Sequence, residues 1–204
     1  LENNAMATID IASASVSSLT GLGFKDHSQR ANAFDASNEG IIRIQPWPTN
    51  GMFQPDTVAS YQVNGQTFLI TANEGDARDY AGFSEEARVA DLVLDPAAFP
   101  DAAVLQLPEN LGRLKITTVD GDNDGDGDFD ELFSYGARSF AIWRTGPVDV
   151  VFDSDSQLEQ ITASRFPNDF NSTDNENNSF DDRSDDKGPE PEGVAIGEVG
   201  GTTY

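Results

Sequence analysis

Short runs of β-branched and aromatic residues, separated by turn residues, dominate the hydrophobic pattern of this chain. Such runs are typical of β-strands rather than of amphipathic helices. The dipeptide Asn64-Gly65 lies between two of them and predicts a two-residue hairpin turn, because both residues tolerate a positive φ. Seven strands are expected, at residues 41–44, 58–63, 67–72, 114–119, 139–143, 148–152 and 194–199.

One helix is expected at residues 84–92, where Ser84 can cap the first turn and Pro96 prevents the helix from continuing. Many short strands joined by long acidic loops are typical of repeated β architectures. The pattern therefore predicts an all-β fold, a β-propeller or part of one, with residues 1–204 forming a single region.

Residues 168–187 form a polar, acidic segment with few apolar residues, which predicts a long surface loop within that region. The strand expected at 194–199 lies close to the last residue, and a hairpin partner would normally follow it. We therefore expect the chain to be part of a longer protein.

Acidic residues strongly outnumber basic ones, 36 against 12, which gives a net charge of −24. This charge disfavours nucleic acid and anionic membrane surfaces as partners and favours cations. No apolar run approaches the length of about 18 residues that spans a bilayer, so no membrane insertion is expected. There is no cysteine and one histidine, His27, so any metal is expected to be held mainly by oxygen.

Carboxylates alternate with glycines in residues 120–131, which we call the acidic loop. Calcium takes six to eight oxygen ligands at about 2.3–2.6 Å, and alternate side chains of a loop can supply them. Without a cation, so many carboxylates would repel one another, although a solvated acidic turn is the alternative. The candidate calcium ligands are Asp120, Asp122, Asp124, Asp126, Asp128, Asp130 and Glu131.

Two registers fit the acidic loop. The first begins at Asp120, has Gly125 at the sixth position and ends with Glu131 at the twelfth, which matches the EF-hand spacing. The flanking residues 113–119 and 132–143 lack helical periodicity, however, so the loop is expected to join two strands.

The second register begins at Asp122, turns at Gly127 and closes with Asp130 at the ninth position, with Asp124 and Asp126 between them. It is favoured because it places Phe129 at the eighth position. An apolar side chain there can point inward and anchor the loop to the core.

Two further clusters could carry chemistry. Glu74, Asp76 and Arg78 directly follow an expected strand, so they should emerge together at one end of a sheet. Glu190 and Glu192 are presented by a segment that two prolines stiffen. The alternatives are a solvated turn for the first cluster and a rigid charged connector for the second.

Seven segments occur in an order that resembles the choice-of-anchor I family, which includes proteins named as atypical alkaline phosphatases and mesenchyme-specific cell-surface glycoproteins. The resemblance implies a β-propeller related to phytase-like and lactonase-like propellers, located outside the cell, in the periplasm or at the cell surface. The segments are residues 51–56, 71–78, 83–91, 111–115, 120–131, 135–140 and 187–194.

The phosphatase label of that family implies a calcium-dependent phosphoester hydrolase. Calcium would polarise the phosphoryl group and activate a water, while Arg78 and Arg138 would bind phosphate. The acidic loop would then be structural. The catalytic calcium ligands implied by the resemblance are Asp56, Glu74, Asp76, Glu190 and Glu192.

The competing hypothesis is a non-enzymatic extracellular module that binds calcium, mineral, or a cell-surface or matrix partner. Arg78 and Arg138 discriminate between the two, because ordinary ion pairs at these residues would remove the phosphate clamp. A third interpretation is a purely structural fragment with open sheet edges.

Overall fold

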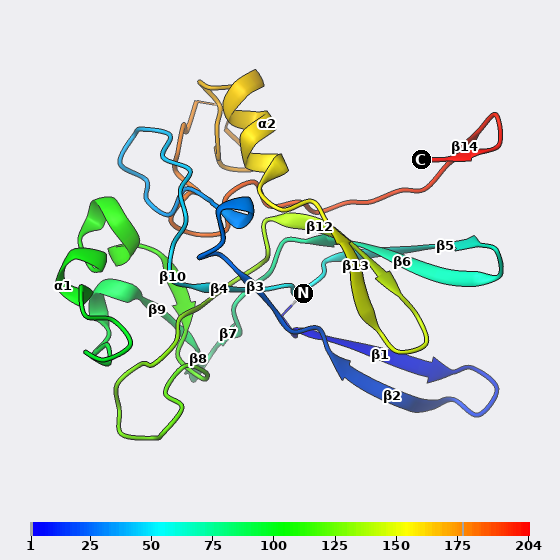
Figure 1. Cartoon of the computed structure of the whole chain (residues 1–204), viewed down its shortest axis with the longest axis horizontal. Helices are drawn as coiled ribbons and strands as arrows, with labels where there is room; N and C mark the ends of the chain where they lie inside the picture. Colours follow the sequence, from blue (N-terminus) through cyan, green and yellow to red (C-terminus); the bar gives the residue numbers. More distant parts are fainter. Residues whose placement is uncertain (1, 177) are drawn as a thin grey trace.

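Short strands make up most of the regular structure in a computed structural model of the chain, which describes residues 2–176 and 178–204 (Figure 1). The strands are β1 (Ala5–Asp10), β2 (Ser15–Gly21), β3 (Phe24–Asp26), β4 (Asn50–Met52), β5 (Thr57–Val63), β6 (Gln66–Asn73), β7 (Asp79–Tyr80), β8 (Phe83–Ser84), β9 (Glu86–Arg88), β10 (Lys115–Thr117), β11 (Phe133–Ser134), β12 (Ser139–Arg144), β13 (Asp149–Asp153), β14 (Glu198–Val199) and β15 (Thr202–Thr203). The helices are α1 (Ala102–Leu105), α2 (Gln157–Arg165) and three short turns, η1 (Arg30–Asn32), η2 (Val89–Asp91) and η3 (Pro108–Gly112). The predicted all-β class is confirmed, and the described strands form no closed barrel.

The sheet with the longer strands is antiparallel and four-stranded, with the order β13-β12-β6-β5. Its β5–β6 turn has Asn64 at φ 52° and Gly65 at φ 79°, so the predicted hairpin is confirmed. Trp143 is buried in its core and donates a hydrogen bond from Nε1 to Thr71 Oγ1 at 2.9 Å. The hairpins of this sheet and β1–β2 extend to one side of the molecule in Figure 1.

A second sheet of five shorter strands, with the order β3-β4-β11-β10-β9, lies beside it and contains the parallel pair β4–β11. Strands β7 to β11 all come from residues 74–138, which are inserted between the neighbouring strands β6 and β12. The largest hydrophobic cluster lies here and includes Phe34, Leu111, Leu114 and Ile116, each at most 1% exposed. Because Phe34 and Trp47 also belong to this cluster, the insertion shares its core with the N-terminal part of the chain.

The expected helix at 84–92 is wrong, because β-pairing prevails there. Ala87 is paired with Ile116 in the five-stranded sheet, and only Val89–Asp91 forms a short 3-10 turn. Residues 41–44 form no strand, whereas α2 was missed because it has no clear apolar face. The strand β14 is shorter than residues 194–199 and pairs with β15.

Residues 168–187 contain no helix or strand in their described part, as expected for a loop. The loop is less exposed than the sequence predicts for a surface loop, because Phe170, Asp181, Ser184 and Asp185 are each at most 1% exposed. Much of the acidic segment is therefore packed into the protein. No helix in the described residues is both long enough and apolar enough to span a bilayer.

Candidate functional site

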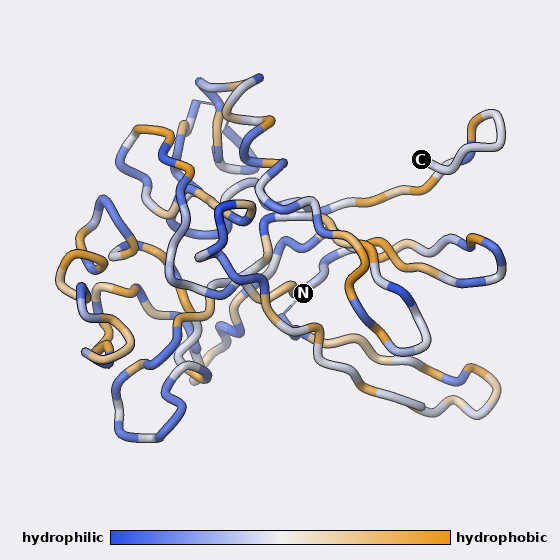
Figure 2. The backbone as a smooth tube through the Cα atoms, viewed as in Figure 1, coloured by the Kyte–Doolittle hydropathy of each residue, from blue (hydrophilic) through white to orange (hydrophobic). Residues whose placement is uncertain are grey.

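The acidic loop joins β10 to β11, so the predicted strand-loop-strand arrangement is confirmed. The Gly121 carbonyl accepts hydrogen bonds from the backbone N–H groups of Asp130 at 2.8 Å and Glu131 at 3.1 Å. These bonds close the loop at its base. It is mostly hydrophilic and projects from the lower left of the molecule in Figure 2.

Three carboxylates of the loop converge. Asp122, Asp124 and Asp130 each place one oxygen so that the three atoms lie within 4.8 Å of one another. Asp122 also accepts hydrogen bonds from the backbone N–H groups of Gly125 at 2.7 Å and Gly127 at 3.1 Å, which fold the chain around it. An all-oxygen group at the surface of a loop fits a hard cation such as calcium.

The converging residues occupy positions one, three and nine of the second register. Of the first register's end residues, Asp120 is exposed outside the group, and Glu131 accepts a hydrogen bond from Asn123 Nδ2 at 3.0 Å. Asp126, the fifth position of the second register, also lies outside the group and accepts the Asp128 N–H at 3.1 Å. The geometry thus matches the second register in part.

Phe129 fastens the loop to the core, as the second register requires. Its N–H donates to the Val93 carbonyl at 2.9 Å, and its own carbonyl accepts the Asp95 N–H at 3.0 Å. Its ring packs against the largest hydrophobic cluster. Beside it, loss of solvent and the nearby carboxylates of Asp126 and Asp95 raise the pKa of Asp128.

A second acidic site lies away from this loop. Glu74, Glu190 and Glu192, predicted from two distant sequence clusters, line one cavity of about 360 Å³ together with Thr173, Asp174, Arg183 and Lys187. Asp76 lines an adjoining cavity of about 100 Å³ that shares Arg183 and Lys187. We call these two cavities the charged cleft.

Basic side chains occupy the charged cleft. Lys187 Nζ lies 2.8 Å from Glu74 Oε1, and Arg183 Nε donates to Glu190 Oε1 at 2.9 Å. Arg183 Nη1 also contacts Asp186 Oδ2 at 2.6 Å. The sequence analysis missed both cations because they lie among many acidic residues, although Lys187 begins the predicted segment 187–194.

The two predicted phosphate-binding arginines are engaged elsewhere. Arg78 donates from Nε and Nη2 to Glu85 Oε2 at 3.1 and 2.5 Å. Arg138 is 3% exposed and donates to Glu159 Oε1 at 2.8 Å and to the backbone carbonyls of Asp35 and Ser184. Neither residue lines the charged cleft.

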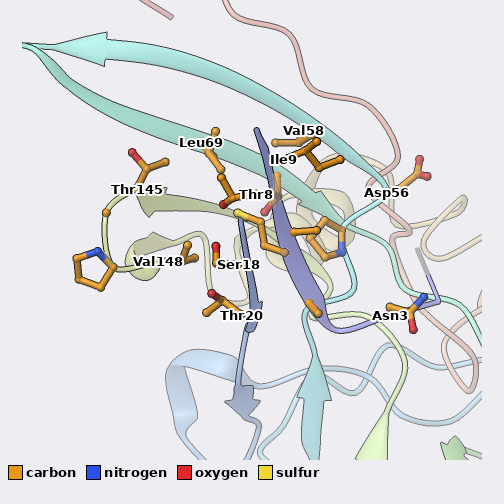
Figure 3. Close-up of a pocket in the computed structure, with 17 residues that line it drawn as sticks. Asn3, Thr8, Ile9, Ser18, Thr20, Asp56, Val58, Leu69, Thr145 and Val148 are labelled. Atoms are coloured by element: carbon orange, nitrogen blue, oxygen red, sulfur yellow. The ribbon is translucent and has the colours of Figure 1, made fainter. Parts of the chain in front are cut away.

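Asp56 is separate from the other predicted metal ligands. It lies on a largely apolar groove of about 890 Å³ between the β1–β2 hairpin and the four-stranded sheet (Figure 3). Met6, Ile9, Val58 and Leu69 line the same groove. Asp56 is the one carboxylate among the groove's lining residues in the described chain, which does not favour a metal site there.

Two curated proteins are similar to this chain. Gigasin-3a of Magallana gigas is 39% identical over 90 residues, which are 42% of this chain and 31% of that protein. The mesenchyme-specific cell surface glycoprotein of Strongylocentrotus purpuratus is 26% identical over 203 residues, 81% of this chain and 25% of that protein. The chain spans between a quarter and a third of the length of these relatives. No solved structure matches it.

A family model described as the choice-of-anchor I domain matches residues 1–204. The match covers the acidic loop, the charged cleft and both main sheets. The chain therefore belongs to the choice-of-anchor I family.

Proposed function

We propose that this chain is a calcium-binding module of a protein located outside the cell or at its surface. The single observation that carries the proposal is the convergence of Asp122, Asp124 and Asp130 within 4.8 Å of one another. Calcium would be held by these carboxylates and by further loop or water oxygens. In this proposal the calcium is structural, because the loop that holds it joins two strands and its coordination leaves little room for a substrate.

The location is supported by the family and by one relative. The choice-of-anchor I match covers the whole chain, and the relative of 81% coverage is named a cell surface glycoprotein. The net charge of −24 suits a calcium-rich exterior. The proposal includes contact with a cell-surface or matrix partner and does not include nucleic acid as a partner.

A β-propeller architecture is the fold that we propose for the protein. The sheet β5-β6-β12-β13 supports it, because propeller blades are four-stranded antiparallel sheets. The strands are neighbours in chain order apart from the insertion of residues 74–138. In this proposal the insertion carries the acidic loop away from the blade.

Calorimetric titration with calcium tests the binding proposal and its register together. Asp122→Asn and Asp130→Asn should each weaken binding at least tenfold, whereas Asp120→Asn should leave it within about threefold. Asp120→Asn is the matched control because it removes the same charge from the same loop. Loss of binding in Asp120→Asn but not in Asp130→Asn would transfer the site to the first register. No calcium uptake by the unaltered chain would end the proposal.

A calcium-dependent phosphoester hydrolase is the second proposal, and one observation favours it. Glu74 lies in the charged cleft with Glu190 and Glu192, although it is far from these two residues in sequence. The engagement of Arg78 by Glu85 and of Arg138 by Glu159 weighs against it. A phosphomonoester assay at alkaline pH, with chelator and then with added calcium, distinguishes the two proposals. Turnover that depends on calcium and disappears in Glu192→Gln would favour the hydrolase.

A further inference from the structure

The charged cleft contains a basic side chain at the place where its carboxylates would hold a metal ion. Lys187 Nζ lies 2.8 Å from Glu74 Oε1 and 3.9 Å from Glu190 Oε1. We propose that Lys187 is a built-in cation that closes this carboxylate group to calcium. The proposal concerns the charged cleft alone and does not rest on the acidic loop. It opposes the calcium-dependent hydrolase, the second proposal above, because that activity would require calcium in this cleft.

Charge balance supports this assignment. The lining of the larger cavity carries four carboxylates, from Glu74, Asp174, Glu190 and Glu192, against two cations, from Arg183 and Lys187. Arg183 is already divided between Glu190 and Asp186. Lys187 is therefore the cation that neutralises Glu74, and without it the cleft would carry a strong excess of negative charge.

The position of Lys187 is set by the backbone and not by its side chain alone. The next residue, Gly188, is buried at φ 65°, and its N–H donates to the Arg183 carbonyl at 2.8 Å. A side chain at Gly188 would collide with the buried pair Arg138 and Glu159. This close packing fixes the point from which Lys187 reaches Glu74.

Burial makes the ammonium difficult to displace. The side chains of Lys187 and Glu74 are 15% and 16% exposed, so solvent screens their attraction only partly. Calcium needs oxygen ligands at about 2.3–2.6 Å, and the ammonium already occupies Glu74 Oε1 and repels a second cation that approaches this carboxylate. The cleft should therefore bind calcium only when the amine is removed.

Counting bound calcium in Lys187→Met tests this role. We expect one calcium per chain more than in the unaltered protein, and the extra ion should disappear in Lys187→Met with Glu74→Gln. Lys115→Met is the matched control, because Lys115 pairs with Glu86 and Asp186 in the adjoining cavity and does not touch Glu74. It should add no calcium, because Arg88 and Arg183 still neutralise Asp186.

A second variant keeps the proposal testable if Lys187→Met does not fold. Glu74→Gln in the otherwise unaltered protein should leave the number of bound calcium ions unchanged, because the amine and not calcium occupies this place. Loss of one calcium in Glu74→Gln would overturn the proposal. So would a folded Lys187→Met that binds no more calcium than the unaltered protein.

Discussion

The acidic loop and the charged cleft are both rich in carboxylates but neutralise them in opposite ways. In the described chain, no carboxylate of the loop forms an ion pair with a lysine or arginine. Asp122 and Asp126 accept hydrogen bonds from backbone N–H groups instead. In the cleft, Glu74, Asp186 and Glu190 each contact a lysine or arginine. In our proposals an external calcium ion supplies the missing cation of the loop, whereas lysine and arginine side chains already pair with these carboxylates of the cleft.

The largest effect is expected from removing the buried cation Arg138, which lies behind the cleft. Arg138→Met should lower the free energy of unfolding by about 3–5 kcal/mol, because it leaves Glu159 as an uncompensated buried charge. Urea unfolding in saturating calcium measures the loss. Arg144→Met is the control, since Arg144 and Asp149 are 47% and 45% exposed. Equal losses in the two variants would show that the Arg138 pair is not an internal structural element.

Removal of calcium should have the next largest effect and should act through the loop alone. A ligand at about a hundred times its dissociation constant stabilises the folded state by about 2.7 kcal/mol, and that stabilisation should be lost in chelator. Phe129 couples the loop to the core, so the melting temperature should fall. The melting temperature of Asp122→Asn should respond less to calcium than that of the unaltered protein, because the variant binds calcium more weakly. An unaltered protein whose melting curve ignores chelator would contradict this coupling.

The acidic loop could be predicted from sequence because its signal is local. Spacing suggested the carboxylates of residues 120–131 as ligands and Phe129 as the anchor; the structure brings Asp122 and Asp130 together and packs Phe129 against the core, while calcium binding stays a prediction. The Asn64-Gly65 hairpin was predictable for the same reason: two adjacent residues determine the turn.

The charged cleft was only partly predictable because long-range contacts build it. Glu74 and Glu190 were predicted as calcium ligands, but nothing in the local sequence shows that Lys187, 113 residues away along the chain, pairs with Glu74. Arg138 was assigned to phosphate from a motif, and its partner Glu159 lies in a helix that the sequence analysis missed. Charge composition alone does not reveal which cation meets which carboxylate.

Acidification should sharpen the contrast between buried and exposed carboxylates. Burial raises the pKa of Asp35 to about 6, and burial likewise raises the pKa of Asp181 to about 6, against an ordinary value of 3.8. The folded state therefore binds these protons more readily than the unfolded state, and the stabilisation is lost as pH rises through about 6. In chelator, the free energy of unfolding should rise by about 2 kcal/mol between pH 7 and pH 5.

Urea unfolding at a series of pH values measures this slope. The slope, rather than the absolute stability, should decrease in Asp35→Asn and in Asp181→Asn, because each variant removes one titrating group. Asp126→Asn is a control for general charge repulsion, since Asp126 is an exposed residue of the acidic loop. A slope reduced equally in all three variants would attribute the pH dependence to net charge and not to the buried carboxylates.

The smallest expected effect compares the cleft pair Lys187 and Glu74 with the exposed pair Arg144 and Asp149. Double-mutant cycles in chelator should give a coupling energy of about 1 kcal/mol for the first pair and about 0.5 kcal/mol or less for the second. In 1 M salt the exposed coupling should vanish, and the cleft coupling should largely persist, because its side chains are 15% and 16% exposed. If both couplings vanish together, Lys187 is a solvated cation that exchanges freely with the medium. The cleft would then resemble the acidic loop, and its carboxylates would be as open to calcium as those of Asp122 and Asp130.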